Sequence, residues 1–179
     1  FMILLASTDL IMVGALGALS IAAVSIFLQP RLILLCFSRS LASSVTLLVS
    51  KKAGAGDTAG TADIMKKSLT LCAIFMGLLH ILFYIFLDDI FYLMGANDEY
   101  MAEAMAYGPI ALAAVYVTSL TLILQAVQLG YGRTSVIMKT NVCGNVVNLA
   151  LNALLIFGFG PIPSLGVTGA AIGTLVSTI

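Results

Sequence analysis

The run AYGPIALAAVYVTSLTLILQAVQ, at positions 106–128, decides the fold class of this chain because no charged residue interrupts it. A helix that crosses a bilayer needs about 20 consecutive, mostly apolar residues, since each residue advances it by about 1.5 Å across a hydrocarbon core about 30 Å thick. The run therefore predicts a transmembrane helix, and the same criterion extends outward from it in both directions.

The composition of the whole chain agrees with a membrane location. Of its 179 residues, 61% are hydrophobic and 9% are charged, and the mean hydropathy is +1.13. A soluble domain carries roughly 25% charged residues, which cover its water-facing surface. The 8 basic and 8 acidic residues cancel, so no basic field indicates a nucleic-acid partner.

Six segments satisfy the criterion for a span and are separated by clusters of glycine, proline and charge. They cover about residues 1–14, 21–50, 68–87, 106–128, 135–157 and 167–179. The first begins at the first residue and the last continues to the end of the chain, so we expect both to be truncated. The predicted fold class is an all-α integral membrane protein, with residues 1–179 in a single transmembrane lobe.

The loops between these spans alternate in charge. Four lysines lie within residues 51–67, the acidic segment 88–103 has no Lys or Arg, and Arg133 and Lys139 follow the fourth span. Cytoplasmic loops carry an excess of Lys and Arg, so the lysine-rich segment is predicted to face the cytoplasm. This orientation places the N-terminus in the cytoplasm, and we expect a multi-pass protein of the inner cell membrane.

A carboxylate lies in the first span. Asp9 is surrounded in sequence by apolar residues, and charged groups at membrane depth indicate function because each must be compensated or removed. A carboxylate there suits the uptake and release of a proton, and it is equally able to ligate a monovalent cation. The alternative is an aspartate that caps the helix or lies at the interface.

The fifth span carries a polar stripe of asparagines spaced by four, three and four residues. At about 100° per residue they fall within roughly 60° of one another on a helix. They are Asn141, Asn145, Asn148 and Asn152. Lipid does not satisfy such a stripe, so we expect it to face other helices or a cavity. The alternative is that the asparagines only join helices, by hydrogen bonds worth about 1 kcal/mol or less each.

Other polar residues in the spans also need partners. Arg39 lies about three helical turns from the lysine segment, so we expect it to line a cavity or to pair with a carboxylate. His80 is expected to hydrogen-bond to a neighbouring helix rather than to relay protons. Gln125 and Gln128 are expected to serve packing near the cytoplasmic end of the fourth span.

Enzyme motifs are absent from the sequence. It has no GxSxG elbow, no HExxH pair and no P-loop, and its three cysteines form no metal-binding pattern. We therefore expect no enzymatic activity, no metal site and no cofactor, and any pumping must draw on an ion gradient.

Short motifs follow one another in a distinctive order from the first span into the sixth. They are DLIMVG (9–14), LG (16–17), AAVS (22–25), LVS (48–50), GAGD (54–57), MGANDE (94–99), GYGRT (130–134), NLALN (148–152), IFG (156–158) and LGVTGAA (165–171). Each motif is weak alone. Their order and spacing together resemble the multidrug and toxic compound extrusion (MATE) family.

The resemblance implies a twelve-helix exporter built of two six-helix lobes. This chain resembles the N-terminal lobe, with its first and sixth helices truncated and the C-terminal lobe absent. The family's cation site then maps onto Asp9 in the first helix and onto Asn148 and Asn152 in the fifth. Thr174 completes the site from the sixth helix. Some relatives carry an aspartate at the position matched to Asn152, which leaves the coupling ion open between H+ and Na+.

The mechanism that the resemblance implies is antiport. Asp9 takes up a proton or Na+ in the outward-open state, the first helix shifts, the cavity narrows, and a small cationic or amphiphilic drug-like molecule leaves outside. Two other classes stay open. One is a flippase for lipid-linked precursors, of the same superfamily, with a more strongly cationic cavity. The other is a membrane scaffold that transports nothing.

Overall fold

A computed structural model describes residues 12–158 and 163–179 of the chain, and these are almost entirely helical. Asp9 lies outside the described residues. The helices are α2 (Ala18–Ile26), α3 (Leu28–Gly54), α4 (Thr58–Ile85), α5 (Leu87–Leu93), α6 (Asp98–Gly130), α7 (Thr134–Phe157) and α8 (Gly166–Thr178). Within the described ranges no strand forms, as the predicted all-α class requires.

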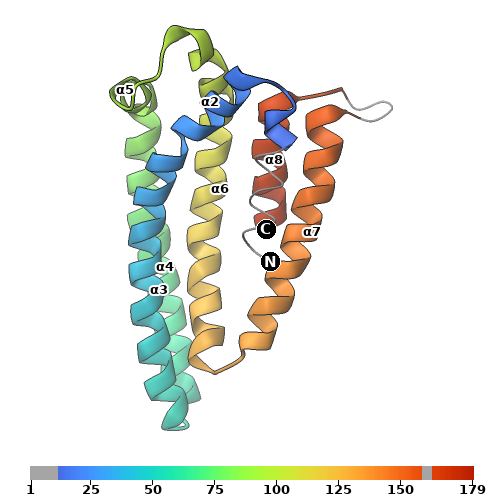
Figure 1. The fold of residues 1–179 in the computed structure, drawn as a ribbon. Helices are drawn as coiled ribbons and strands as arrows, with labels where there is room; N and C mark the ends of the chain where they lie inside the picture. Colours follow the sequence, from blue (N-terminus) through green and yellow to red (C-terminus); the bar gives the residue numbers. More distant parts are fainter. Residues whose placement is uncertain (1–11, 159–162) are drawn as a thin grey trace.

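Helix α6 is the centre of the arrangement (Figure 1). Helices α3 and α4 pack together on one side of it, and α7 and α8 form a second group on the other side. Among the described residues, four helical segments are long and apolar enough to cross a membrane, namely Ala18–Gly54, Thr58–Ile85, Asp98–Gly130 and Thr134–Phe157. The apolar helix Gly166–Thr178 is shorter. The described residues thus form a bundle of membrane-spanning length.

The core between α3, α4 and α6 contains a small polar contact. Ser38 Oγ of α3 donates to Ser119 Oγ of α6 at 2.8 Å, and both residues are fully buried. Ser119 Oγ in turn donates to the carbonyl of Val115 at 2.8 Å. Met76 and Cys72 of α4 pack against this pair. Small residues and hydroxyl hydrogen bonds of this kind let membrane helices approach closely, which fixes α6 against α3 and α4.

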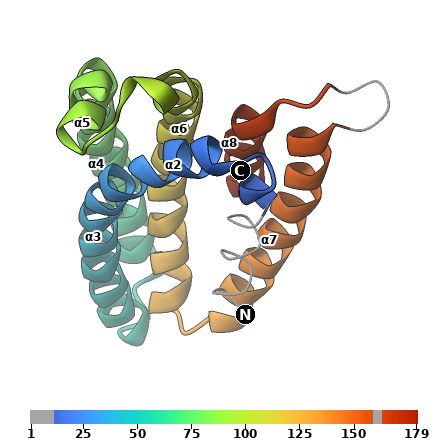
Figure 2. The same cartoon turned by 45° about the horizontal axis from the view of Figure 1, so that its top comes forward.

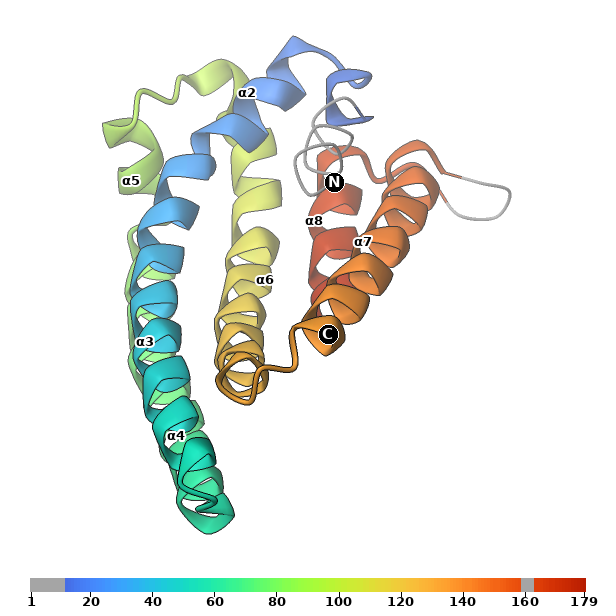
Figure 3. The same cartoon turned by 60° about the horizontal axis from the view of Figure 1, so that its bottom comes forward.

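The turns of opposite charge lie at opposite ends of the bundle. The α3–α4 turn, beside Lys51 and Lys52, lies at the same end as the α6–α7 turn with Arg133 (Figure 3). Helix α5, which carries Asp88 and Asp89, lies at the other end together with α2 (Figure 2). Basic and acidic connections therefore alternate between the two ends of the bundle, and the predicted orientation depends on this alternation. Which end faces the cytoplasm stays a prediction.

The segment predicted as one span over 21–50 contains a break at Phe27, where α2 ends and α3 begins. The cause is Pro30. A continuous helix needs the amide of residue 30 to donate to the carbonyl of Ile26, and proline has no amide hydrogen. Pro30 instead occupies the first turn of α3, where that hydrogen is not needed.

Two helices extend beyond the predicted spans. Helix α4 begins at Thr58 rather than near residue 68, so much of the predicted lysine loop is helical, and the α3–α4 connection is only residues 55–57. Helix α6 begins at Asp98 rather than near residue 106. In α6 the acidic residues Asp98 and Glu99 occupy the first turn, where they interact favourably with the positive end of the helix dipole, so a charge cluster that looks like loop sequence is helical.

Asp57 begins α4 as its N-cap. Its Oδ1 accepts a hydrogen bond from the Gly60 amide at 2.7 Å, and its Oδ2 pairs with Lys52 Nζ at 2.8 Å. The Lys52 hydrogen bond, and then the Gly60 amide, hold the pKa of the Asp57 carboxyl below its ordinary value. A lowered pKa stabilises the fold above the ordinary aspartate pKa, and this contribution is lost as the pH falls through the lowered value.

We predict that Asp57→Ala lowers the melting temperature of the detergent-solubilised protein, because the Gly60 amide loses its acceptor. Asp57→Asn keeps a capping oxygen, so its melting temperature should fall much less. The matched control is Asp63→Ala, which removes only an exposed i,i+4 pair with Lys67. Thermal unfolding by far-UV circular dichroism measures all three. Equal melting temperatures for Asp57→Ala and Asp63→Ala contradict the capping role.

Candidate functional site

Helices α7 and α8 approach each other through two glycines of α8. A Cβ added at Gly169 would lie 2.7 Å from the carbonyl carbon of Leu155 in the α7 backbone. A Cβ added at Gly173, one turn further on, would collide with Oδ1 of Asn152. This spacing of small residues by four is the pattern that lets membrane helices come into backbone contact. The sequence of α8 therefore sets how closely the polar side chains of α7 can meet it.

A cluster of hydrogen bonds lies at this contact. Asn152 is 1% exposed, and its Nδ2 donates to Oδ1 of Asn148 at 3.2 Å. Nδ2 of Asn148 reaches α8, where Ser177 Oγ lies at 3.2 Å and Thr174 Oγ1 at 3.5 Å. The structure thus brings together three of the four residues predicted to bind a cation: Asn148, Asn152 and Thr174. Ser177, one turn beyond Thr174 on α8, joins them.

The chemistry of this α7–α8 cluster is that of neutral oxygen donors. Amide and hydroxyl oxygens are ligands for hard cations such as Na+, yet they carry no charge to balance one. A carboxylate would supply that charge, and Asp9, the residue predicted for that role, lies outside the described residues. Within the described part of the chain, no group of three His, Cys, Asp or Glu residues could hold a metal ion.

The other half of the asparagine stripe faces a different neighbour. A cavity of about 860 Å³ opens between α3, α6 and α7. Asn141, Asn145 and Arg39, the three residues predicted to line a cavity, all line this one. Asn141 Oδ1 accepts a hydrogen bond from Gln125 Nε2 of α6 at 3.0 Å. We call this space the α3–α6–α7 cavity; most of its remaining lining is aliphatic.

Gln125 and Ser177 were not predicted to belong to either site. Gln125 was assigned to packing, but its amide is the partner that fixes Asn141 at the cavity wall. Ser177 lies three residues after Thr174, so the two hydroxyls share one face of α8. That spacing was readable from the sequence, whereas the pairing of Gln125 with Asn141 depends on how α6 and α7 pack.

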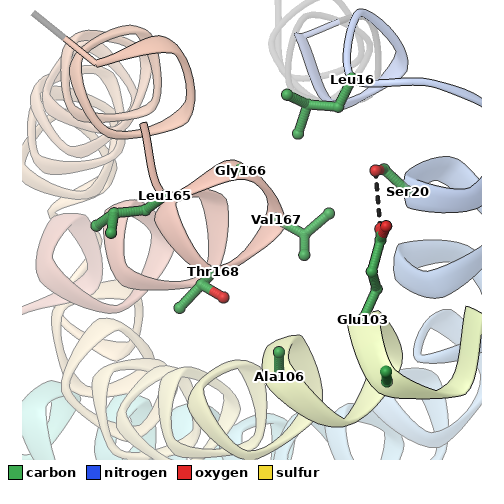
Figure 4. A pocket seen from close by; sticks show the side chains of 9 residues that line it. Leu16, Ser20, Glu103, Ala106, Leu165, Gly166, Val167 and Thr168 are labelled. Carbon is green, nitrogen blue, oxygen red and sulfur yellow. Dashed lines mark hydrogen bonds between the residues drawn. The ribbon is translucent and has the colours of Figure 1, made fainter. Parts of the chain in front are cut away.

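A second pocket, of about 450 Å³, lies at the end of the bundle where α2 and α5 are. In it Ser20 Oγ of α2 donates to Glu103 Oε2 of α6 at 2.8 Å (Figure 4). Val167, in the first turn of α8, extends toward this pair from the opposite wall. Glu103 was read only as part of an acidic loop. It is instead a half-buried helical carboxylate that faces a pocket.

His80 packs as a core residue of α4. It is 7% exposed, and its Nδ1 donates to the carbonyl of Met76 on the same helix at 2.7 Å. Its ring meets the ring of Tyr116 of α6 edge-on, with centroids 5.5 Å apart. The expectation of a bond to a neighbouring helix was wrong in its detail, because the hydrogen bond stays within α4 and only the ring contact crosses to α6.

Long apolar helices with a polar cluster at their contacts and a cavity between them define a multi-pass helical membrane protein. A family model described as MatE matches residues 1–154, and the chain belongs to this family. The resemblance inferred from the ordered motifs is thereby confirmed.

Curated relatives match nearly the whole chain. A probable multidrug resistance protein NorM from Rhizobium meliloti (strain 1021) is 30% identical over 169 residues, which cover 94% of this chain and 36% of the relative. A FAD transporter from Shewanella oneidensis is 29% identical over 175 residues, covering 94% of this chain and 37% of the relative. The chain therefore spans a little over a third of the length of these relatives.

Solved structures agree on the fold. A crystal structure of MATE in the bent conformation superposes with a TM-score of 0.88 at 28% sequence identity. The superposition covers 98% of this chain and 38% of that one. The predicted fold class, a part of a MATE-type helical transporter, is confirmed by this match.

We predict that Gly169→Ala lowers the free energy of unfolding by about 1–3 kcal/mol, the usual cost of overpacking, because the added methyl group meets the α7 backbone. Gly54→Ala is the matched control, since a Cβ there meets nothing within 4 Å. Denaturant unfolding in detergent compares the two variants. A Gly169→Ala protein as stable as Gly54→Ala shows that α7 and α8 are not in backbone contact.

Proposed function

We propose that this chain is the N-terminal, six-helix lobe of a twelve-helix exporter that expels small drug-like molecules, cationic or amphiphilic, in exchange for H+ or Na+. The observation that carries the proposal is the α7–α8 cluster, in which buried Asn152 contacts half-buried Asn148 and Asn148 contacts half-buried Thr174, beside a separate cavity of ligand size. A membrane scaffold has no need of either feature. The relatives' names, multidrug resistance and FAD transport, support export of organic molecules.

The coupling ion binds, in this proposal, at the α7–α8 cluster together with Asp9. The neutral oxygens of Asn148, Asn152 and Thr174 supply ligands or hydrogen bonds, and the Asp9 carboxylate supplies the charge. Proton uptake neutralises Asp9, whereas Na+ requires it to stay ionised and be surrounded by several oxygens. Either ion changes the charge that the first helix presents to α7.

Antiport follows if this charge change moves the first helix. Uptake of H+ or Na+ by Asp9 in the outward-open state weakens its hydrogen bonds to the asparagine stripe. The first helix then shifts, the space inside the lobe narrows, and the organic substrate leaves outside. Release of the ion toward the cytoplasm resets the transporter. The second lobe is required, so the chain alone should not transport.

The proposed location is the inner cell membrane, with the end that carries Lys51, Lys52 and Arg133 facing the cytoplasm. The N-terminus then lies in the cytoplasm. The pocket beside Glu103 opens toward the outside, where it adjoins the first turn of α8.

We predict that Asp9→Asn abolishes efflux of a fluorescent drug-like dye from cells that make the full-length protein, under an imposed pH or Na+ gradient. The reason is that a neutral amide neither takes up a proton nor balances Na+. Asp63→Asn is the matched control, because Asp63 is an exposed carboxylate paired with Lys67 at the predicted cytoplasmic end. It should pump like the wild type at equal expression.

Comparing the two gradients identifies the ion, because only the coupled gradient drives dye out of wild-type cells. Efflux that is equal in wild type and Asp9→Asn means that Asp9 is structural and the coupling proposal is wrong. If the wild-type protein moves no dye under either gradient, the result favours a lipid-precursor flippase or a scaffold over a drug exporter.

A further inference from the structure

Among the described residues that line the α3–α6–α7 cavity, Arg39 is the one with an ionised side chain. It stands near the middle of α3 (Leu28–Gly54), twelve residues before Lys51, which corresponds to about 18 Å along a helix. This depth places a permanent positive charge in the apolar layer. Such a charge is expensive there unless it has a partner or faces water.

The described part of the chain provides no anion for Arg39. The ion pairs formed there are Lys52 with Asp57 at the α3–α4 turn and Lys67 with Asp63 within the N-terminal part of α4. The other described acidic residues are at the opposite end, in α5 and in the first turns of α6. The described residues of the cavity wall therefore carry a net positive charge and include no carboxylate.

The remaining walls suit an amphiphilic ligand. The cavity volume of about 860 Å³ lies within the range of roughly 300–1,000 Å³ typical of sites for drug-sized molecules. Leu47, Leu122 and Met138 supply apolar surface from α3, α6 and α7. The amides of Asn141 and Asn145 add polar groups along one wall, and Asn141 is already held by Gln125.

We propose that the α3–α6–α7 cavity binds an amphiphilic organic anion, a drug-sized molecule with a carboxylate or sulfonate that pairs with Arg39 and an apolar body that packs on the aliphatic walls. The inference rests on the proposed exporter function for its role in transport, and it narrows the substrate class of that exporter from cationic or amphiphilic molecules to anionic amphiphiles. The guanidinium forms two parallel hydrogen bonds with such a group. These bonds orient the anionic end of the ligand and select for its negative charge.

The test compares two fluorescent probes that share a fluorophore and differ in charge, dansyl-aminohexanoate with a carboxylate and dansylcadaverine with an ammonium group. Their equilibrium binding to the purified full-length protein is measured in an uncharged maltoside detergent, without any ion gradient. We expect the wild type to bind the carboxylate probe about tenfold more tightly or better, since a hydrogen bond to a charged group is worth about 1.5–3 kcal/mol.

Variants of Arg39 locate the charge effect. Arg39→Gln should weaken carboxylate-probe binding about tenfold and leave dansylcadaverine unchanged. Arg39→Lys keeps the charge but loses the two parallel hydrogen bonds, so its preference for the carboxylate probe should lie between those of the wild type and Arg39→Gln. The matched control is Arg31→Gln, which removes an exposed arginine of the same helix that does not line the cavity. It should bind both probes like the wild type.

Three outcomes overturn the proposal. One is a wild-type protein that binds the ammonium probe as tightly as the carboxylate probe. This comparison uses the wild type alone, so it does not depend on whether a variant folds. The second is Arg39→Gln with unchanged carboxylate affinity, which means that Arg39 pairs elsewhere in the full-length protein. The third is an equal loss in Arg31→Gln, which indicates a general charge effect of the micelle. Because binding needs no gradient, these results are separate from the loss of efflux tested with Asp9→Asn.

Discussion

The candidate cation site depends on the close approach of α7 and α8. With glycine at positions 169 and 173 no side chain separates the two helices, so Asn152 fits against the α8 backbone and Asn148 reaches Ser177. In a bilayer such contacts are favoured by packing and hydrogen bonds rather than by the hydrophobic effect, because lipid tails are as apolar as leucine. The hydrogen bonds of the site therefore depend directly on the close packing of α7 against α8.

Helix α7 also connects two sites of different chemistry. Toward one end its asparagines bond to α8, and toward the other end they line the cavity that includes Arg39. A helix in a close-packed protein moves as a stiff element. A shift of α7 relative to α8 therefore alters the cavity between α3, α6 and α7 at the same time. In the proposed antiport, this connection is the physical route, within one lobe, by which ion binding affects the bound organic molecule.

Composition and periodicity predicted the existence and type of the long helices, because apolar runs of this length have few other stable solutions. They did not predict where the helices end, since acidic residues at Asp98 and the capping of α4 by Asp57 look like loop sequence. The asparagine stripe was visible as one face of α7, but its division between α8 and a cavity was not. Periodicity identifies a polar face, whereas the neighbour of that face is set by packing, as the pairing of Gln125 with Asn141 shows.

The division of the stripe is tested most directly by single cysteines along α7, in a full-length protein whose Cys36, Cys72 and Cys143 are replaced by alanine. A small water-soluble maleimide is applied to membranes that contain Asn141→Cys, Asn145→Cys, Asn148→Cys, Asn152→Cys or the exposed control Val146→Cys. The structure predicts rapid labelling at 141 and 145, which line the cavity, protection at 148 and 152 behind α8, and slow labelling in lipid at 146. Equal labelling at all four asparagine positions contradicts the account, because the stripe then faces one continuous space.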